Sequence, residues 1–372
     1  IGNNFGTSNF ETSEKQLLTN GTINDFATAG FGNNVDYRLN DAYIGFEYKF
    51  KIGRWTNKPG LYFHWYHLKT NQPDGNYTLS KTLFQPQWTS EFEFNKSESL
   101  HFNYKLENDF PEANQLANRF TLQSYNSVFK GNALLKNERF HSANLRYNKM
   151  NLYRGINWNA SANFNKKVRT TRNQIQISGI NQFNTPIITD NPETNWRFYG
   201  SFQKKIYRFR AGVNTSFSWF NYTQTLNNIT TKNDRNDQNL GITLRTAKRE
   251  WPDLEVGYTK GFSQFNGITQ TNYKTDAFNA SGSIEFLKHF VYKFSYENLK
   301  NTDNNNQSNF YEIANASLRY QKKNSPFGFE ISINNLFNTT LKNDYTFSDY
   351  SITQRTTYVL PRVILFSVSY KL

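Results

Sequence analysis

The stretch AYIGFEYKFKI, residues 42–52, decides the fold. Its even-numbered positions are apolar or aromatic throughout, whereas Glu47, Lys49 and Lys51 stand at odd-numbered positions. Successive side chains of a β-strand point to opposite faces. The alternation therefore predicts a strand with one apolar face and one polar face.

The same period of two recurs along nearly the whole chain, and no long segment has the spacing of an amphipathic helix. We predict strands over 40–52, 59–69, 86–95, 98–107, 138–150, 153–166, 194–204, 207–222, 237–247, 252–265, 273–286, 289–299, 308–322, 326–335 and 357–371. Most are longer than the roughly 5–6 residues usual in soluble proteins. A transmembrane strand needs about 9–11 residues, so the lengths indicate strands that cross a membrane.

The composition combines a low mean hydropathy of −0.78 with 17% aromatic residues. No run of about 18 apolar residues exists, which excludes a helical membrane protein. The aromatic content argues against disorder, and the absence of cysteine excludes disulfides and thiolate metal sites. Strands with a lipid-facing side and a polar side account for both numbers, because half of each strand and all of the loops can be polar.

The charge is strongly positive, with 43 Lys and Arg residues against 29 Asp and Glu residues and a formal net charge of +14. Such a balance raises the question of a nucleic-acid partner. The basic residues are scattered singly among Asn and Thr, which favours a solvated basic surface instead. We expect no nucleic-acid partner.

Short and long connections alternate between the predicted strands. The long ones lie near 70–85, 108–137, 167–193, 223–236, 266–272, 300–307 and 336–356. Bacterial outer-membrane barrels have short periplasmic turns and long extracellular loops. We therefore predict an all-β, transmembrane, antiparallel up-and-down β-barrel over 40–372, preceded at 1–39 by an extracellular loop and a partial strand.

The predicted strands number fifteen, and a weakly patterned strand within 5–18 would make sixteen. A sheet that ends in open edges would leave unpaired backbone groups in lipid. We expect further strands to precede Ile1.

Three segments resemble TonB-dependent outer-membrane receptors. GNALLKNE, residues 131–138, resembles the Gly-Asn-Pro-x-Leu-x-x-Glu loop of that family through Gly131, Asn132, Leu135 and Glu138. INNLFN at 333–338 and PRVILFSVSYKL at 361–372 are similar to the segments around the family's last long loop and closing strand. The residues that carry these two likenesses are Asn335, Leu336, Phe337, Asn338, Pro361 and Arg362.

The resemblance implies the C-terminal part of a 22-stranded barrel, and the Asn-, Lys- and Tyr-rich style resembles Bacteroidota members. It implies import of a ligand captured by extracellular loops, driven by TonB if a plug domain and a TonB box lie upstream. The chain departs from the family pattern at Ala133, Ser367 and Leu372, and nothing in it resembles a plug.

Other candidate residues follow from position along the strands. The closing strand would present a lipid face and an assembly signal through Ile364, Phe366, Val368, Tyr370 and Leu372. Amphipathic rings sit at membrane interfaces, which suggests girdle positions for Trp55, Trp88, Trp196 and Trp251. Basic residues near the outer rim could pair with lipopolysaccharide phosphates, and the candidates are Arg169, Arg172 and Lys232.

Alternative functions stay open. The barrel could be a structural or assembly subunit of an outer-membrane complex, with a surface lipoprotein or other subunits as partners. An enzyme is disfavoured, because no nucleophile elbow, phosphate loop or zinc motif occurs. His64 and His67 are three apart on a strand and face opposite sides, so they cannot share a metal. We expect no cofactor and place the protein in the bacterial outer membrane.

Overall fold

The computed structural model describes residues 1–247, 252–304, 306–323, 325–347 and 352–371. Apart from the single-turn helices η1 (Phe26–Ala29) and α1 (Ala113–Leu116), its regular elements are strands. The strands are β1 (Gly2–Glu11), β2 (Lys15–Leu17), β3 (Ile23–Asp25), β4 (Asn34–Glu47), β5 (Phe50–Ile52), β6 (Trp55–Gln72), β7 (Gly75–Asn95), β8 (Glu98–Asp109), β9 (Phe120–Ser124), β10 (Ser127–Lys130), β11 (Glu138–Asn151), β12 (Ile156–Ser178), β13 (Asn181–Thr189), β14 (Glu193–Ile206), β15 (Phe209–Leu226), β16 (Ile229–Thr246), β17 (Asp253–Asn266), β18 (Gln270–Phe286), β19 (Phe290–Thr302), β20 (Ser308–Gln321), β21 (Phe327–Asn334), β22 (Leu341–Phe347), β23 (Ile352–Tyr358) and β24 (Val363–Tyr370).

One 20-stranded sheet forms the wall of the molecule. Four of its members are local additions: β5 continues β4, and β9, β10 and β13 lie beside the main run of strands. The remaining sixteen pair antiparallel with their neighbours in chain order, from β1 and β4 through to β21 and β24. This confirms the predicted all-β up-and-down fold, and β1 supplies the sixteenth strand that the sequence left open.

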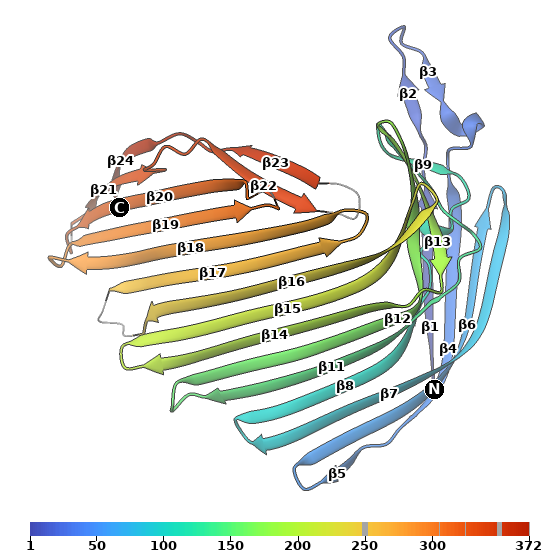
Figure 1. Cartoon of the computed structure of the whole chain (residues 1–372), viewed down its shortest axis with the longest axis horizontal. Coiled ribbons are helices and arrows are strands. Elements are labelled where there is room, and N and C mark those ends of the chain that lie inside the picture. The colour runs from blue at the N-terminus through green and yellow to red at the C-terminus, as the bar shows by residue number, and fades with distance from the viewer. Residues whose placement is uncertain (248–251, 305, 324, 348–351, 372) are drawn as a thin grey trace.

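The sheet is strongly curved and open, as Figure 1 shows. β1 pairs with β4 on one side, and β24 pairs with β21 on one side. In the part of the chain that the structure describes, no register joins β1 to β24. The outer edges of these two strands therefore keep backbone groups without a partner in the sheet.

The two rims of the wall differ. Connections at 96–97, 152–155, 207–208 and 287–289 make one rim, named here the short-turn rim. Connections at 12–33, 110–137 and 335–362 make the opposite one, the long-connection rim. Along the chain, connections at the short-turn rim therefore alternate with connections at the long-connection rim, as the sequence predicts.

Three of the predicted long loops are largely strand. β6 and β7 meet at residues 73–74, β12 and β13 at 179–180, and β15 and β16 at 227–228. Asn227 and Asn228 have φ of 48° and 65°, the conformation that a two-residue hairpin turn requires and that Asn tolerates. In the β15–β16 hairpin, polar residues occupy both faces beyond the wall, so the period-two contrast that marks a strand fades there.

The register separates an apolar face from a polar face. On β14 and β15, Trp196 lies opposite Trp219 and Phe198 opposite Phe217. The intervening row runs from Asn163 through Arg197 and Ser218 to Asp237 across four strands, and it lines a hollow of 550 Å³. The polar face is therefore the concave one, and the apolar face is the outside of the curve.

The height of the apolar face suits a bilayer. On β14 it extends from Trp196 to Ile206, which is about 33 Å along a strand at about 3.3 Å per residue. With the strand tilt of about 40° usual in membrane barrels, that length covers about 25 Å along the membrane normal. No helix among the described residues is long and apolar enough to cross a membrane.

The segment 110–137 folds onto the concave face. Leu116 of α1 and Leu135 are fully buried against Leu68 of β6, with Leu39 and Leu79 packed around them. A second buried cluster joins Val35 to Ala113 and Ala117. This packing fixes α1 against the inner wall of β4, β6 and β7 at the long-connection rim.

Candidate ligand-binding site

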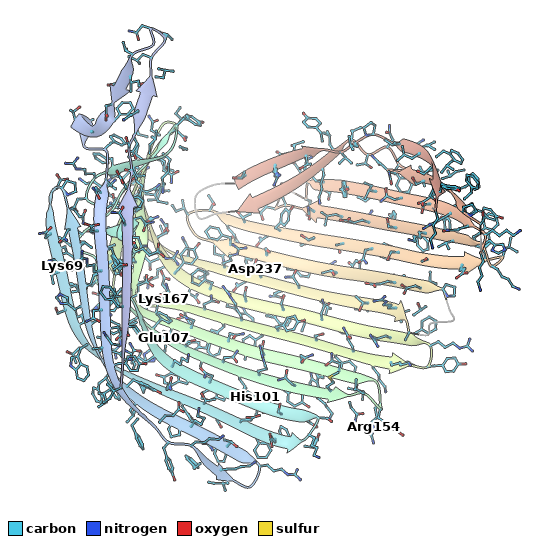
Figure 2. The ribbon with its side chains drawn as sticks, turned by 180° about the vertical axis from the view of Figure 1, so that it is seen from behind. Lys69, His101, Glu107, Arg154, Lys167 and Asp237 are labelled. Carbon is cyan, nitrogen blue, oxygen red and sulfur yellow. The ribbon has the colours of Figure 1, made fainter. Side chains whose placement is uncertain are left out.

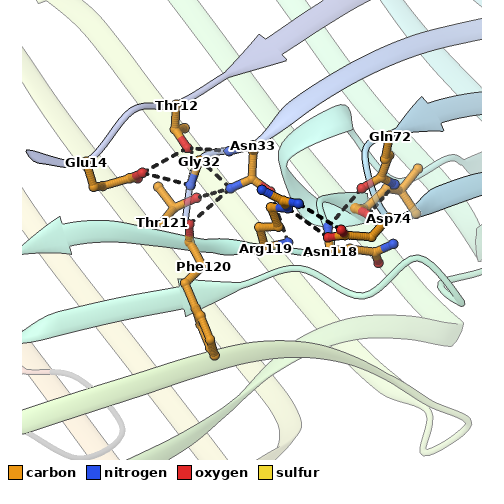
Figure 3. A network of polar contacts seen from close by, with 11 residues as sticks. Thr12, Glu14, Gly32, Asn33, Gln72, Asp74, Asn118, Arg119, Phe120 and Thr121 are labelled. Carbon is orange, nitrogen blue, oxygen red and sulfur yellow. Dashed lines mark hydrogen bonds and ion pairs between the residues drawn. The ribbon is translucent and has the colours of Figure 1, made fainter. Parts of the chain in front are cut away.

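A network of polar contacts at the long-connection rim centres on Asn33, whose side chain is 2% exposed (Figure 3). Its Nδ2 donates to the carbonyl oxygen of Phe120 at 3.1 Å and to Thr121 Oγ1 at 3.0 Å. Its Oδ1 accepts from the backbone N–H of Arg119 at 3.1 Å. One buried amide thus joins the end of the first long connection to segment 110–137.

Glu14 and Gln72 extend the same network (Figure 3). Glu14 accepts hydrogen bonds from the backbone N–H groups of Gly32, at 3.2 Å, and Leu122, at 3.3 Å. Gln72 accepts from the backbone N–H of Asn118 at 2.9 Å and donates to the Leu116 carbonyl at 2.9 Å. Long connections from separate parts of the chain are therefore held together.

Arg119 and Asp74 add an ion pair to the network. Arg119 donates through Nε and Nη2 to the two carboxylate oxygens of Asp74, both at 2.8 Å. The hydrogen bond from Arg119 is the main reason that the pKa of Asp74 lies below its ordinary value of 3.8. The pair fastens segment 110–137 to the turn between β6 and β7.

This network positions two phenylalanine rings. Phe120 follows Arg119 directly, and its backbone N–H donates to the carbonyl of Gly30 at 2.9 Å. Phe31 bridges to Phe120, with the ring centroids 5.4 Å apart. The Phe120 ring meets that of Phe183 edge to face at 5.9 Å. Three separate segments therefore contribute adjacent aromatic side chains.

Beside these rings lies a hollow of 670 Å³, within the roughly 300–1,000 Å³ typical of small-molecule sites. Four segments line it: Phe31 just after η1, the β9–β10 hairpin, the β12–β13 hairpin and the β15–β16 turn. Its lining residues are Phe31, Phe120, Tyr125, Asn126, Val128, Gln176, Ile177, Ser178, Asn181, Gln182, Phe183, Asn227 and Asn228. We name this feature the rim hollow.

The rim hollow is uncharged. Among the described residues that line it there is no Asp, Glu, Lys or Arg, although the chain carries a net charge of +14. Aromatic rings and side-chain amides dominate instead. Sequence reasoning missed this site, because its members come from segments far apart in the chain and amide-rich loops are usually only solvated.

The motif resembling the receptor-family loop has a physical role at each position. A Cβ on Gly131 would lie 2.6 Å from the carbonyl oxygens of both Gln115 and Ala117, so only glycine fits there. Asn132 donates to the Pro186 carbonyl at 3.2 Å, and Leu135 is fully buried. The motif therefore packs against α1 and fixes its position.

Glu138 closes that motif at the start of β11. Its carboxylate lies 2.7 Å from Lys167 Nζ and accepts from Thr170 Oγ1 at 3.2 Å and from the backbone N–H of Thr171 at 2.5 Å. Lys167 and Glu107, labelled in Figure 2, lie on either side of Phe140 in the register. Glu138 thus joins β11 to β12 at the long-connection rim.

The second motif holds the last long connection. Asn335, 3% exposed with φ of 56°, donates through Nδ2 to the carbonyls of Thr339 and Leu360, both at 2.7 Å. Leu336 donates its backbone N–H to Ala314, and the Phe337 ring meets Tyr296 edge to face. Asn338 accepts from the backbone N–H of Arg362 at 2.9 Å, next to Pro361.

The closing strand β24 is exposed on its apolar side. Ile364 and Phe366 are each 66% exposed, Val368 is 55% exposed and Tyr370 is 59% exposed. The rings of Phe366 and Tyr370 contact Phe329 and Phe327 of β21. Leu372 lies outside the described residues. A role as an assembly signal stays a prediction.

The girdle candidates are about two-fifths exposed. Trp55, beside the short-turn rim, donates to Ser90 Oγ at 2.6 Å. Trp88 lies opposite Pro59 and donates to Asn57 Oδ1 at 3.2 Å. Trp196 lies toward the long-connection rim and packs on Phe164 at 4.3 Å. Trp251 lies outside the described residues, and the girdle role stays a prediction.

The three basic candidates differ in their surroundings. Arg172 donates through two nitrogens to Glu193, at 2.7 and 3.0 Å, and helps line a hollow on the concave face. Its charge is thus already matched. Arg169 lies 3.3 Å from the exposed Asp190. Lys232 is exposed, and in the part of the chain described here no ion pair joins it to an acidic residue.

A polar and aromatic cluster on the concave face was not foreseen. His64 Nδ1 lies 2.7 Å from Asp41 Oδ1, and the imidazole stacks on Tyr43 and Tyr66 at centroid distances of 5.1 and 5.3 Å. His67 instead contacts Ser80. No group of three metal-ligating side chains occurs among the described residues.

Comparisons with known proteins add little at the level of sequence. No family model matches the chain. No curated protein matches it.

Similar solved structures are bacterial outer-membrane proteins, at low scores. OmpT, an outer membrane protein of Vibrio cholerae, is 8% identical with a TM-score of 0.32, over 91% of this chain and 97% of that one. The ferric-catecholate import receptor Fiu of Escherichia coli K12 is 11% identical, with a TM-score of 0.31 over 91% of this chain and 63% of that one. The ferripyoverdine receptor of Pseudomonas aeruginosa is 10% identical, with a TM-score of 0.30 over 98% of this chain and 70% of that one. Scores of this size do not establish a relationship, and the fold given above rests on the chain's own strand registers.

Proposed function

We propose that this chain forms the wall of a bacterial outer-membrane β-barrel of the TonB-dependent receptor type, which captures a ligand at its extracellular rim for import. The observation that carries the proposal is the rim hollow, which lies where the long connections 12–33 and 110–137 are fastened to each other and to the end of β6. This point is at one end of a wall tall enough to cross a membrane. The long-connection rim is then extracellular, as in bacterial barrels generally. The proposal gives the chain no catalytic step.

The free edges of β1 and β24 bear on the same proposal. Backbone N–H and C=O groups cannot remain unpaired in lipid, because each unsatisfied group costs on the order of several kcal/mol there. We propose that further strands close the wall, so that β1 and β24 each gain a neighbour. A plug domain and a TonB box encoded with the chain would complete an energised importer.

Import is tested in the organism that carries the gene. A deletion strain is grown in competition with its parent on single carbon, iron and cofactor sources. We expect the deletion strain to grow poorly on one particular source. The full gene should restore growth on that source, and a gene that lacks its TonB box should not. Equal restoration by both genes, with equal surface levels, would exclude TonB-driven import.

A scaffold in an outer-membrane complex is the second candidate. The β2–β3 hairpin projects beyond the wall (Figure 1), and its Leu17 and Ile23 are 74% and 66% exposed. Exposed apolar side chains on a projecting element suit a protein partner such as a surface lipoprotein. Stoichiometric co-purification that Leu17→Asn and Ile23→Asn abolish would support this function, whatever the outcome for the TonB box.

Lipopolysaccharide is the lipid partner that we propose for the rim. Lys232 lies on the same parity of β16 as the apolar Leu240 and Ile242, and thus on the outer face of the β15–β16 hairpin. Arg139 and Arg169 lie opposite each other in the register of β11 and β12. Two adjacent guanidinium groups and an ammonium suit phosphate groups, which Arg binds in a bidentate manner.

A further inference from the structure

We infer that the rim hollow binds an uncharged saccharide. This inference rests on the proposed function and names the substrate class for the same site. It depends on three features of the lining: the absence of charge, the flat aromatic faces and the disposition of the amide groups.

The lining first restricts the charge of the occupant. An anionic ligand, such as a ferric chelate with carboxylate or phenolate groups, gains most from Arg or Lys donors in its site. A cationic ligand would gain from carboxylates. Neither kind of side chain lines the hollow in the described part of the chain. Lys130 Nζ lies 5.0 Å from the centroid of the Phe120 ring but does not belong to the lining.

The aromatic side chains supply flat apolar surfaces. Phe120 and Phe183 are held by their edge-to-face contact, whereas Tyr125 is 87% exposed at the tip of the β9–β10 hairpin. A pyranose ring presents one face of C–H bonds, which stacks on an aromatic ring and is apolar enough to gain from burial there. An extended polar chain without such a face would gain less.

The amides supply neutral hydrogen-bonding groups in fixed positions. Asn227 Oδ1 accepts from the backbone N–H of Ile177 at 2.7 Å, and Asn228 Oδ1 accepts from Gln174 Nε2 at 2.7 Å. Their oxygens are therefore held by the neighbouring hairpin. Among the described residues, neither Nδ2 group donates to a protein acceptor, so each retains two N–H donors. Hydroxyl groups of a sugar are suitable acceptors.

The experiment uses the full-length protein purified from outer membranes in detergent. Binding is measured with maltohexaose, xylohexaose and mannohexaose as neutral probes, with a polygalacturonate hexamer as the acidic probe and a ferric catecholate as the chelate probe. We expect binding of at least one neutral probe and of neither charged one. Tyr125→Ala should raise the Kd about tenfold, the effect of losing about 1.4 kcal/mol of stacking between one aromatic ring and the sugar.

Tyr153→Ala is the matched control, because Tyr153 is a fully exposed tyrosine in the turn between β11 and β12 at the opposite rim. It should leave the Kd unchanged. Asn228→Asp keeps the shape of the turn and adds a negative charge, and it should weaken neutral binding less than Tyr125→Ala does. Heat-dependent gel migration confirms that each variant is folded.

Three results would overturn the inference: tighter binding of the acidic or chelate probe, no binding of any neutral probe, or an equal loss in Tyr125→Ala and Tyr153→Ala. Its failure is distinguishable from failure of the proposed function. TonB-dependent growth on a charged nutrient would support the import proposal and reject the saccharide inference. Binding of a neutral probe without TonB-dependent growth would support the saccharide inference and reject the import proposal.

Discussion

Glu138 Oε2 lies 2.7 Å from Lys167 Nζ, so the first residue of β11 is tied to the neighbouring strand β12 at the long-connection rim. The other carboxylate oxygen accepts from Thr170 and Thr171. The side chain of Glu138 is only 16% exposed. This contact gives a physical meaning to the last position of the family-like motif.

Glu138→Gln should lower the free energy of unfolding by about 1.5 kcal/mol, because it removes the charge that Lys167 and two further donors share. Urea unfolding in detergent micelles, followed by tryptophan fluorescence, measures the change. Glu11→Gln, at an exposed position on β1, serves as the control and should have no effect. Equal midpoints for all three proteins would contradict a stabilising role for Glu138.

Acid should loosen segment 110–137 through the pair of Arg119 and Asp74. The pKa of Asp74 is lower in the folded protein than its ordinary value of 3.8, chiefly because of the hydrogen bond from Arg119. The unfolded state therefore binds the proton more readily, and stability falls as the pH drops. The contribution is complete well above pH 4 and is lost as the pH falls through the depressed pKa.

Hydrogen exchange of residues 110–137, measured between pH 6 and pH 3 and corrected for intrinsic rates, checks this expectation. Wild-type protection should decline at the acid end of the range. Asp74→Asn should show reduced protection at pH 6 and no further step. A wild-type protection that stays constant to pH 3 would mean that the pair does not hold the segment.

Gly131→Ala should displace part of segment 110–137. The added Cβ would lie 2.6 Å from the backbone carbonyl oxygens of Gln115 and Ala117, which is too close for a stable contact. We expect a loss of about 1–3 kcal/mol, as for other overpacked sites. Trypsin cleavage after Arg119 or Lys130 should accelerate. Gly6→Ala is the matched control, since nothing lies within 4 Å of its added Cβ, and it should behave like the wild type.

The wall of the molecule could be predicted from the sequence. Its strands are patterned by two environments, and the alternation in residues 42–52 appears in the register as opposite faces of β4 and β5. The hairpins beyond the wall could not be delimited in this way. Thr230 and Thr231, for example, point to opposite faces and are both polar, so no contrast in polarity marks their strand.

The rim hollow was beyond sequence reasoning for a different reason. Phe31, Phe120 and Phe183 lie together in space although they are far apart in the sequence. Asn33 holds the first two in place by binding the backbone of Arg119 and Phe120, and its contact with Phe120 spans 87 residues of chain. A period-two pattern carries no information about such long-range contacts. The motif 131–138 was recognisable, but its purpose as an anchor for α1 required the distance from Gly131 to the Gln115 carbonyl.

The direction of the two faces gives the sharpest test of the membrane assignment. Phe198 and Tyr199 are neighbours on β14 with comparable exposures of 38% and 49%. Phe198 belongs to the apolar row with Phe217, and Tyr199 lies opposite Ser216 on the concave side. If lipid covers the apolar face, Phe198→Arg should destabilise the folded protein in phospholipid vesicles, lowering its free energy of unfolding by about 2–4 kcal/mol. Tyr199→Arg should change it little, because water fills the concave side. In a water-soluble fold with both faces solvated, the two variants would be equally mild, and that result would exclude a lipid-facing wall.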